Sequence, residues 1–120
     1  MPDSRPQIID PQAFDEAKTM MQQKFPTIIG YFLEDTRLYI DTIREGLEKH
    51  QAGIVVTASH TIKSSARQIG AFTLANYAAA IEETARHCVL NDNDFDILIQ
   101  KSEDIETIFQ ATEREIKARA

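Results

Sequence analysis

Residues 60–71 read HTIKSSARQIGA, and together with the residues just before them they decide how the fold is interpreted. Apolar side chains recur here every three or four positions, which is the spacing of one face of an α-helix. This apolar face comprises Val55, Ala58, Ile62, Ala66 and Ile69. The same spacing places on the opposite face His60, Lys63, Ser64, Arg67 and Ala71. The sequence therefore predicts an amphipathic helix that presents a histidine to solvent among cations and small side chains, a setting that suits a phosphoryl group.

The rest of the chain repeats this helical pattern and lacks the alternation typical of strands. All four prolines lie within the first 26 residues, so little interrupts a helix beyond that point. Glycines and short polar clusters separate the apolar-periodic stretches and are expected to end the helices. The expected helices are Pro11–Met21 capped by Asp10, Thr27 to about Lys49, a third that ends at about Ile69, Thr73–Val89, and Asp94–Lys117.

Long helices joined by short turns predict an all-α fold, an antiparallel up-and-down four-helix bundle with a short extra N-terminal helix across one end. Residues 1–11 are expected to form an irregular leader. Residues 12–120 are expected to form the bundle, since a chain of 120 residues has the length of one domain.

The composition excludes several classes of protein. A formal net charge of −6 is unsuited to nucleic acid, whose phosphates are neutralised by Lys and Arg. The single cysteine, Cys88, permits no intrachain disulfide and fits a reducing compartment. No apolar run approaches the length of a membrane span, and the first residues lack the apolar core of a signal peptide. These observations predict a cytoplasmic protein.

The segment His60-x-Ile62-Lys63-Ser64-Ser65-Ala66, followed by Gly70-Ala71, resembles the motif of histidine-containing phosphotransfer (HPt) domains. The resemblance extends to the helix pattern from about residue 12 to the end. It implies a helical bundle whose histidine, here His60, is phosphorylated on Nε2. Such a domain accepts the phosphoryl group from an aspartate of one receiver domain and passes it to an aspartate of another.

The residue types around His60 make chemical sense for this reaction. A solvent-facing imidazole, with an ordinary pKa of about 6.5, is largely neutral and nucleophilic near neutral pH. Lys63, one turn further along, is expected to neutralise a phosphate oxygen. The small side chain of Ser64 lets another protein approach closely and can donate its hydroxyl to the phosphoryl group. Arg67 adds positive charge or contacts the incoming domain.

The resemblance also assigns roles on the fourth helix. Glu82 would accept a hydrogen bond from Nδ1–H of His60 and leave Nε2 free as the nucleophile. Arg86 would help to hold that pocket and the phosphate. The implied partners are receiver domains of a hybrid histidine kinase and of a response regulator. The chain is expected to act as a monomer without a cofactor of its own, with Mg²⁺ bound by the receiver.

The docking surface is expected to contain apolar residues near His60. Thr61 and Val56 flank the histidine on its own helix, and Met21 and Phe25 are the preferred exposed candidates at the N-terminal side. Because the chain has no glycine-rich ATP loop, we expect a phosphoryl carrier without kinase activity.

Interpretations without a phosphorylated histidine compete with the phosphotransfer hypothesis. A histidine on a helix surface is usually an ordinary solvated residue, and that interpretation is preferred for His50 and His87. Ser64 and Ser65 lack the surroundings of a hydrolase nucleophile. The alternative function is a non-catalytic helical adaptor in which His60 is never phosphorylated.

Overall fold

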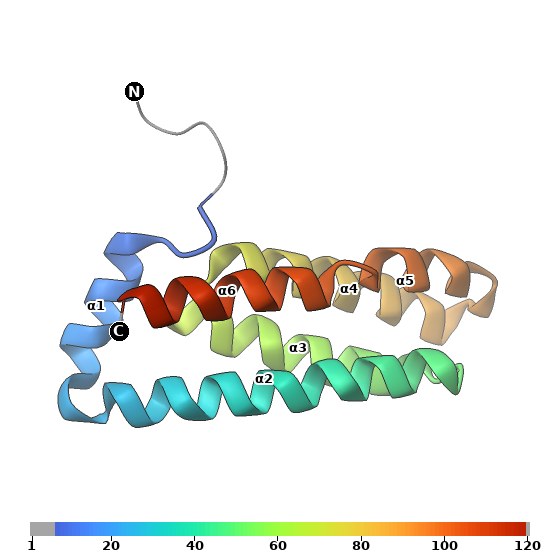
Figure 1. The fold of residues 1–120 in the computed structure, drawn as a ribbon. Helices are drawn as coiled ribbons and strands as arrows, with labels where there is room; N and C mark the ends of the chain where they lie inside the picture. Colours follow the sequence, from blue (N-terminus) through green and yellow to red (C-terminus); the bar gives the residue numbers. More distant parts are fainter. Residues whose placement is uncertain (1–6, 120) are drawn as a thin grey trace.

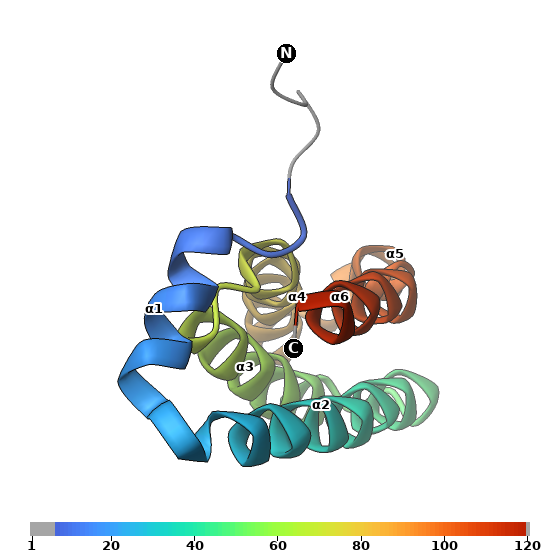
Figure 2. The same ribbon diagram turned by 60° about the vertical axis from the view of Figure 1, so that its left-hand side comes forward.

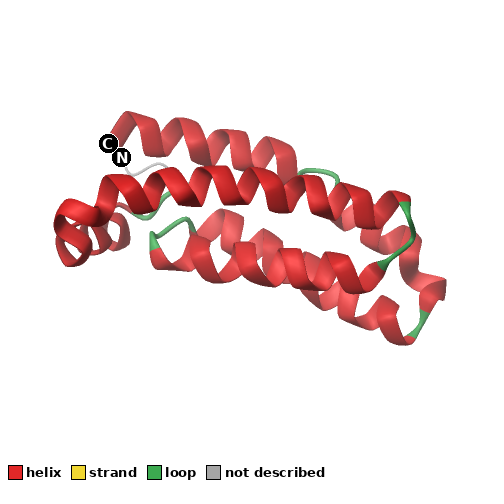
Figure 3. Cartoon of the chain, turned by 90° about the horizontal axis from the view of Figure 1, so that it is seen from below, coloured by secondary structure: helices red, strands yellow, loops and turns green. Residues whose placement is uncertain are grey.

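The computed structural model describes residues 7–119, which are almost entirely helical (Figure 3). No strand occurs within this range. The α-helices are α1 (Pro11–Met21), α2 (Phe25–Glu48), α3 (Ala52–Gln68), α4 (Phe72–Leu90), α5 (Phe95–Ser102) and α6 (Ile105–Arg119). Two short 3₁₀ turns, η1 (Gln22–Lys24) and η2 (Asp92–Asp94), precede α2 and α5.

The long helices form a four-helix bundle with up-and-down connections, which confirms the predicted fold class. Helices α2, α3 and α4 run back and forth in chain order, and α5 and α6 together provide the fourth helix (Figure 1). Viewed closer to the bundle axis, α1 lies across one end, as the sequence predicted (Figure 2). Helix α3 lies between α2 and α4, so residues of α3 that face outward are flanked by both neighbours.

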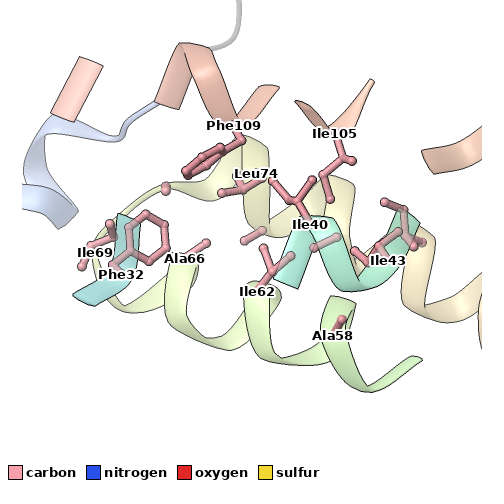
Figure 4. Packing of buried hydrophobic residues seen from close by; sticks show 14 of the residues in the cluster. Phe32, Ile40, Ile43, Ala58, Ile62, Ala66, Ile69, Leu74, Ile105 and Phe109 are labelled. Atoms are coloured by element: carbon pink, nitrogen blue, oxygen red, sulfur yellow. The ribbon is translucent and has the colours of Figure 1, made fainter. Parts of the chain in front are cut away.

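One aliphatic and aromatic core runs along the bundle axis. Ile62 of α3, Ile40 of α2 and Leu74 of α4 are fully buried and converge with Phe109 of α6 (Figure 4). Burial of such side chains contributes about 1.5–3 kcal/mol each. The core therefore fixes the rotation of α3, which leaves His60 on the outside.

The prediction of one continuous last helix is wrong, because a break separates α5 from α6. The backbone N–H of Asp104 donates to the hydroxyl of Tyr77 on α4 over 3.0 Å. A side chain that inserts into the helical hydrogen-bond ladder is a recognised cause of helix breaks. The apolar spacing continues across the break through Leu98, Ile105 and Phe109, so the sequence pattern contained no sign of it.

Gly70 shapes the end of the bundle on which α1 lies. Its φ of +80° is a left-handed conformation, and a Cβ at this position would lie 2.9 Å from the Cβ of Ala13. The Gly70 carbonyl accepts a hydrogen bond from the backbone N–H of Asp10 over 2.9 Å. This turn also explains a wrong prediction for Ala71. The α3 helix ends at Gln68, so Ala71 does not continue its outer face and is buried.

The expected leader at residues 1–11 is described only in part, since residues 1–6 lie outside the described range. Residues 7–10 are not helical, and α1 begins at Pro11 with the Asp10 side chain capping the Ala13 N–H. Within this irregular stretch the side chain of Ile9 is buried, whereas Gln7 is exposed. None of the helices in the described range is both long and apolar enough to cross a membrane.

Candidate functional site

The outward face of α3 presents His60, whose side chain is 53% exposed. On either side of it along the helix, Ala58, Ser59 and Ile62 are buried. Nδ1 of His60 lies 2.9 Å from Oε2 of Glu82 on the neighbouring helix α4. The imidazole is therefore anchored at one nitrogen while much of the ring remains open to solvent.

Glu82 is the centre of a cluster that also contains two cations. Its side chain is only 6% exposed. Nζ of Lys63 donates to Oε1 over 2.5 Å. Arg86, one turn further along α4, donates to Oε2 from Nη2 over 2.7 Å and from Nε over 3.1 Å. Both carboxylate oxygens thus have charge-assisted partners, which is the condition for burying an ionised carboxylate.

The electrostatics of this cluster keep Glu82 ionised. Burial raises the pKa of its carboxyl, but hydrogen bonds from Lys63, Arg86 and His60 outweigh burial and hold the pKa at about 2. A carboxylate can only accept a hydrogen bond, so the proton between His60 and Glu82 belongs to Nδ1. In the neutral imidazole Nε2 then carries the lone pair. The site offers a nucleophilic nitrogen of fixed orientation, backed by one anion and two cations.

Comparison with known proteins identifies the family. The family model described as Hpt domain matches residues 27–115, a range that contains the whole cluster. This chain belongs to the Hpt domain family. It is accordingly a histidine phosphotransfer protein of a phosphorelay, as the motif around His60 predicted.

The fold of a solved Hpt protein agrees. The crystal structure of histidine-containing phosphotransfer protein B (HptB) from Pseudomonas aeruginosa PAO1 matches with a TM-score of 0.81 and 21% sequence identity. The match covers 96% of each chain, so the two share the whole fold, including α1. A search of the curated proteins gave no match.

The Hpt fold brings together His60, Lys63, Glu82 and Arg86, as the preceding distances show. Lys63 contacts the carboxylate of this cluster directly. Its ammonium group donates to Glu82 and its side chain is 20% exposed, so it offsets the charge of this carboxylate, and its contact with a phosphate oxygen stays a prediction. Ser64 and Arg67 are exposed on the same face of α3. Both side chains are therefore accessible to a partner protein, as their predicted roles require.

The other predicted docking residues are either half-buried or buried. Val56 and Thr61 are half-buried beside His60 on α3. Met21 is half-buried at the end of α1 and packs against the core. Phe25 was wrong as an exposed candidate, because it is buried with its ring edge-on to Phe14 at a centroid distance of 5.2 Å. The two aromatic rings join α1 to the start of α2.

Sequence reasoning missed Val89 and Leu90 at the end of α4. Their side chains are 58% and 89% exposed, although both are aliphatic. The buried residues Ile81, Ala85 and Cys88 define the inward face of this part of the helix. Leu90 falls outside the spacing of that series, whereas Val89 lies four residues after Ala85 and continues it. An aliphatic residue off the buried face is a signal by which Leu90 could have been found.

The other two histidines make structural contacts. Nε2 of His50 lies 2.8 Å from the Asp92 carboxylate, and its ring stacks on Phe95 at 3.7 Å. Nε2 of His87 lies 2.8 Å from Asp94. In both cases the contact fastens η2 to the rest of the bundle, and Nε2 is the nitrogen that is engaged. His60 differs because its anchored nitrogen is Nδ1.

Proposed function

We propose that His60 carries the phosphoryl group, accepting it on Nε2 from an aspartyl phosphate of one receiver domain and delivering it to the aspartate of another. The observation that carries this proposal is the hydrogen bond between Nδ1 and the buried Glu82 carboxylate. That contact orients the ring and determines which nitrogen attacks.

In the forward step, the Nε2 lone pair forms a bond to phosphorus while the bond between phosphorus and the aspartate oxygen breaks. The aspartate leaves as a carboxylate and needs no proton. The imidazole, with phosphorus on Nε2 and hydrogen on Nδ1, gains positive charge. Glu82 faces that charge and stabilises it, and the reverse sequence delivers the group to the second receiver.

Charge compensation comes from both proteins. Lys63 and Arg86 together carry one more positive charge than Glu82 removes, which favours an anionic phosphoryl group nearby. Ser64, small and exposed, leaves room for the receiver and can donate its hydroxyl, and Arg67 supplies a further cation at the edge of the contact. We expect Mg²⁺ to be bound by receiver carboxylates, the hard oxygen ligands that this ion prefers.

The proposed partners are receiver domains of a hybrid histidine kinase and of a response regulator. The chain would act on them as a monomer, because the exposed face around His60 must be free for each receiver in turn. A cytoplasmic setting is proposed from the single, buried Cys88, which suits a reducing compartment.

The test is phosphoryl transfer from a ³²P-labelled receiver domain to this chain. The parent should acquire an acid-labile, base-stable label, which is the signature of a phosphorus–nitrogen bond. His60→Gln should abolish the label while leaving helicity unchanged. His50→Gln is the matched control, since it removes an exposed histidine that also contacts a carboxylate, and it should label like the parent.

Two results would contradict the proposal. If His60→Gln acquires as much label as the parent, another residue carries the phosphoryl group. If the parent takes no label from any receiver domain of its source organism, the helical adaptor without a phosphorylated histidine becomes the better account.

A further inference from the structure

Helices α3 and α4 pack against each other through small side chains. Ser59 and Ala66 of α3 are fully buried, and so are Ala78 and Ala85 of α4. The two helices lie side by side, and they make the most extensive contact between helices in the described part of the chain (Figure 2). The distance between packed helices depends on the side chains at their contact, so small side chains here bring α3 and α4 close together.

The cluster around Glu82 shows how the two helices face each other. His60 and Lys63 of α3 both contact Glu82 of α4. A short turn reverses the chain between α3 and α4, so residues that precede this contact on α3 lie opposite residues that follow it on α4. Ser59 is thereby placed opposite Ala85, within about one helical turn of the histidine and of the carboxylate.

Glu82 belongs to the same row of small residues on α4. Ala78, Glu82 and Ala85 are separated by four and three positions, so they share one face of the helix, and all three are buried. The carboxylate therefore emerges from a close helix contact, and Nδ1 of His60 lies 2.9 Å from it. A further separation of about 0.7 Å would take this pair beyond hydrogen-bond distance.

The hydroxyl of Ser59 is satisfied within its own helix. Its Oγ donates to the Val55 carbonyl over 2.6 Å and lies 3.2 Å from the Val56 carbonyl. Both acceptors belong to the preceding turn of α3, a common arrangement for a serine inside a helix. The property of Ser59 that bears on α4 is therefore the small size of its side chain.

We propose that Ser59 is a positioning residue for phosphoryl transfer, whose small side chain sets the separation of α3 and α4 at which Glu82 holds Nδ1 of His60. A larger side chain forces the two helices apart, because a packed core accommodates an added methyl group by shifts of side chains and backbone. The imidazole and the carboxylate then separate although neither is altered. This inference rests on the proposed function of His60 and adds a residue that determines the geometry of its hydrogen bond.

The test separates the size of Ser59 from its hydroxyl. Ser59→Ala removes the hydroxyl and adds no volume, whereas Ser59→Thr keeps the hydroxyl and adds one methyl group. The matched control is Ser102→Thr, because Ser102 on α5 is also buried and also donates to the carbonyl four residues earlier, over 2.9 Å. The double variant Ser59→Thr/Ala85→Gly adds a methyl group on α3 and removes one from the facing side of α4.

Three measurements are made on each variant. Transfer from a phosphorylated receiver domain is followed over a range of receiver concentrations, which separates kcat from KM. Labelling by phosphoramidate, a small donor, reports the reactivity of His60 without a receiver. The ¹⁵N chemical shifts of the His60 ring report which of its nitrogens carries the proton.

Ser59→Thr should lower kcat by about tenfold, since misplaced reacting groups slow the chemical step, and should leave the KM for the receiver within about twofold of the parent. Phosphoramidate labelling should slow in parallel, and the ¹⁵N shifts should show the proton shared between Nδ1 and Nε2. Ser59→Ala and Ser102→Thr should transfer like the parent. The double variant should recover most of the lost rate.

Three results would overturn the inference. The first is a slow Ser59→Ala with a normal Ser59→Thr, which would assign the effect to the hydroxyl. The second is a Ser59→Thr that transfers like the parent, and the third is equal slowing by Ser59→Thr and Ser102→Thr, which would indicate a general effect of lost stability.

The double variant decides the question if Ser59→Thr alone does not fold. Transfer at nearly the parent rate then supports the inference, and slow transfer by the folded double variant overturns it. Absence of label in the parent from either donor would instead refute the role of His60.

Discussion

The carboxylates of the buried Glu82 and the half-buried Glu106 are both paired with two cations and differ in their other contacts. Glu82 contacts Lys63 and Arg86, and Glu106 contacts Arg37 and Arg44. Hydrogen bonds from Arg37 lower the pKa of the Glu106 carboxyl to about 2 against the opposing effect of burial, with a further contribution from Arg44. The pKa of Glu82 is also about 2.

The difference lies in what else each carboxylate contacts. Arg37 and Arg44 both come from α2, so Glu106 on α6 fastens two helices across the bundle. Glu82 joins α3 to α4 in a comparable way, but Oε2 also lies 2.9 Å from Nδ1 of His60. A helix-joining ion pair becomes part of a reactive site when one of its hydrogen bonds orients an exposed imidazole. A depressed carboxylate pKa alone does not distinguish the two clusters.

Alanine substitution at each carboxylate gives the largest expected contrast. Glu82→Ala frees the imidazole to rotate and should slow transfer by about 10- to 100-fold, since misplaced reacting groups cost rates of that order. Glu106→Ala should leave the transfer rate within about twofold of the parent and lower the free energy of unfolding by about 1–3 kcal/mol, the typical cost of losing hydrogen bonds to a charged group. Transfer kinetics and urea unfolding measure the two effects.

Glu82→Gln sharpens the same comparison. The amide oxygen can still accept from Nδ1–H, so this variant should recover most of the transfer rate lost in Glu82→Ala. Equal loss in the Gln and Ala variants would show that the negative charge of Glu82, rather than its hydrogen bond to Nδ1, supports transfer. A slow Glu106→Ala variant that is still fully folded would remove the distinction between the clusters.

Acid unfolding provides a second, smaller contrast. The pKa of both carboxyls is about 2 in the folded protein and 4.5 in its ordinary setting. The unfolded chain therefore binds more protons in this interval, and stability present above pH 4.5 is lost as the pH falls toward 2. The loss should be on the order of 2 kcal/mol for each carboxylate.

Urea unfolding between pH 6 and 2 checks this expectation. Glu82→Gln and Glu106→Gln should each show a shallower fall in stability than the parent, because each lacks one of the titrating groups. A profile that both substitutions leave unchanged would show that the folded-state pKa of neither carboxyl is depressed.

Much of the fold followed from the sequence, because apolar spacing determines which face of each helix is buried. That spacing placed His60 outside and Ile62 inside without reference to any partner helix. It failed where a contact distant in sequence decides the outcome. The break before Ile105 depends on the hydroxyl of Tyr77, and the burial of Phe25 depends on the ring of Phe14.

The sequence was sufficient to predict which residues form the site. It was less informative about which of these residues contact one another. The motif pointed to His60, and the family resemblance pointed to Glu82 and Arg86. Spacing along one helix cannot show that Lys63 turns toward α4, since that choice is made by the buried carboxylate opposite it. Leu90 was overlooked because it lies outside the buried spacing, which is also the reason that it is exposed.

The central claim, that Glu82 holds Nδ1 and thereby selects Nε2 of His60 as the phosphoryl acceptor, is tested most directly by NMR of the phosphorylated, ¹⁵N-labelled protein. The imidazole nitrogen that couples to phosphorus identifies the bonded atom. The account predicts phosphorus on Nε2 of His60 and a proton retained on Nδ1. Phosphorus on Nδ1 of His60, or on the ring of His50 or His87, would contradict it.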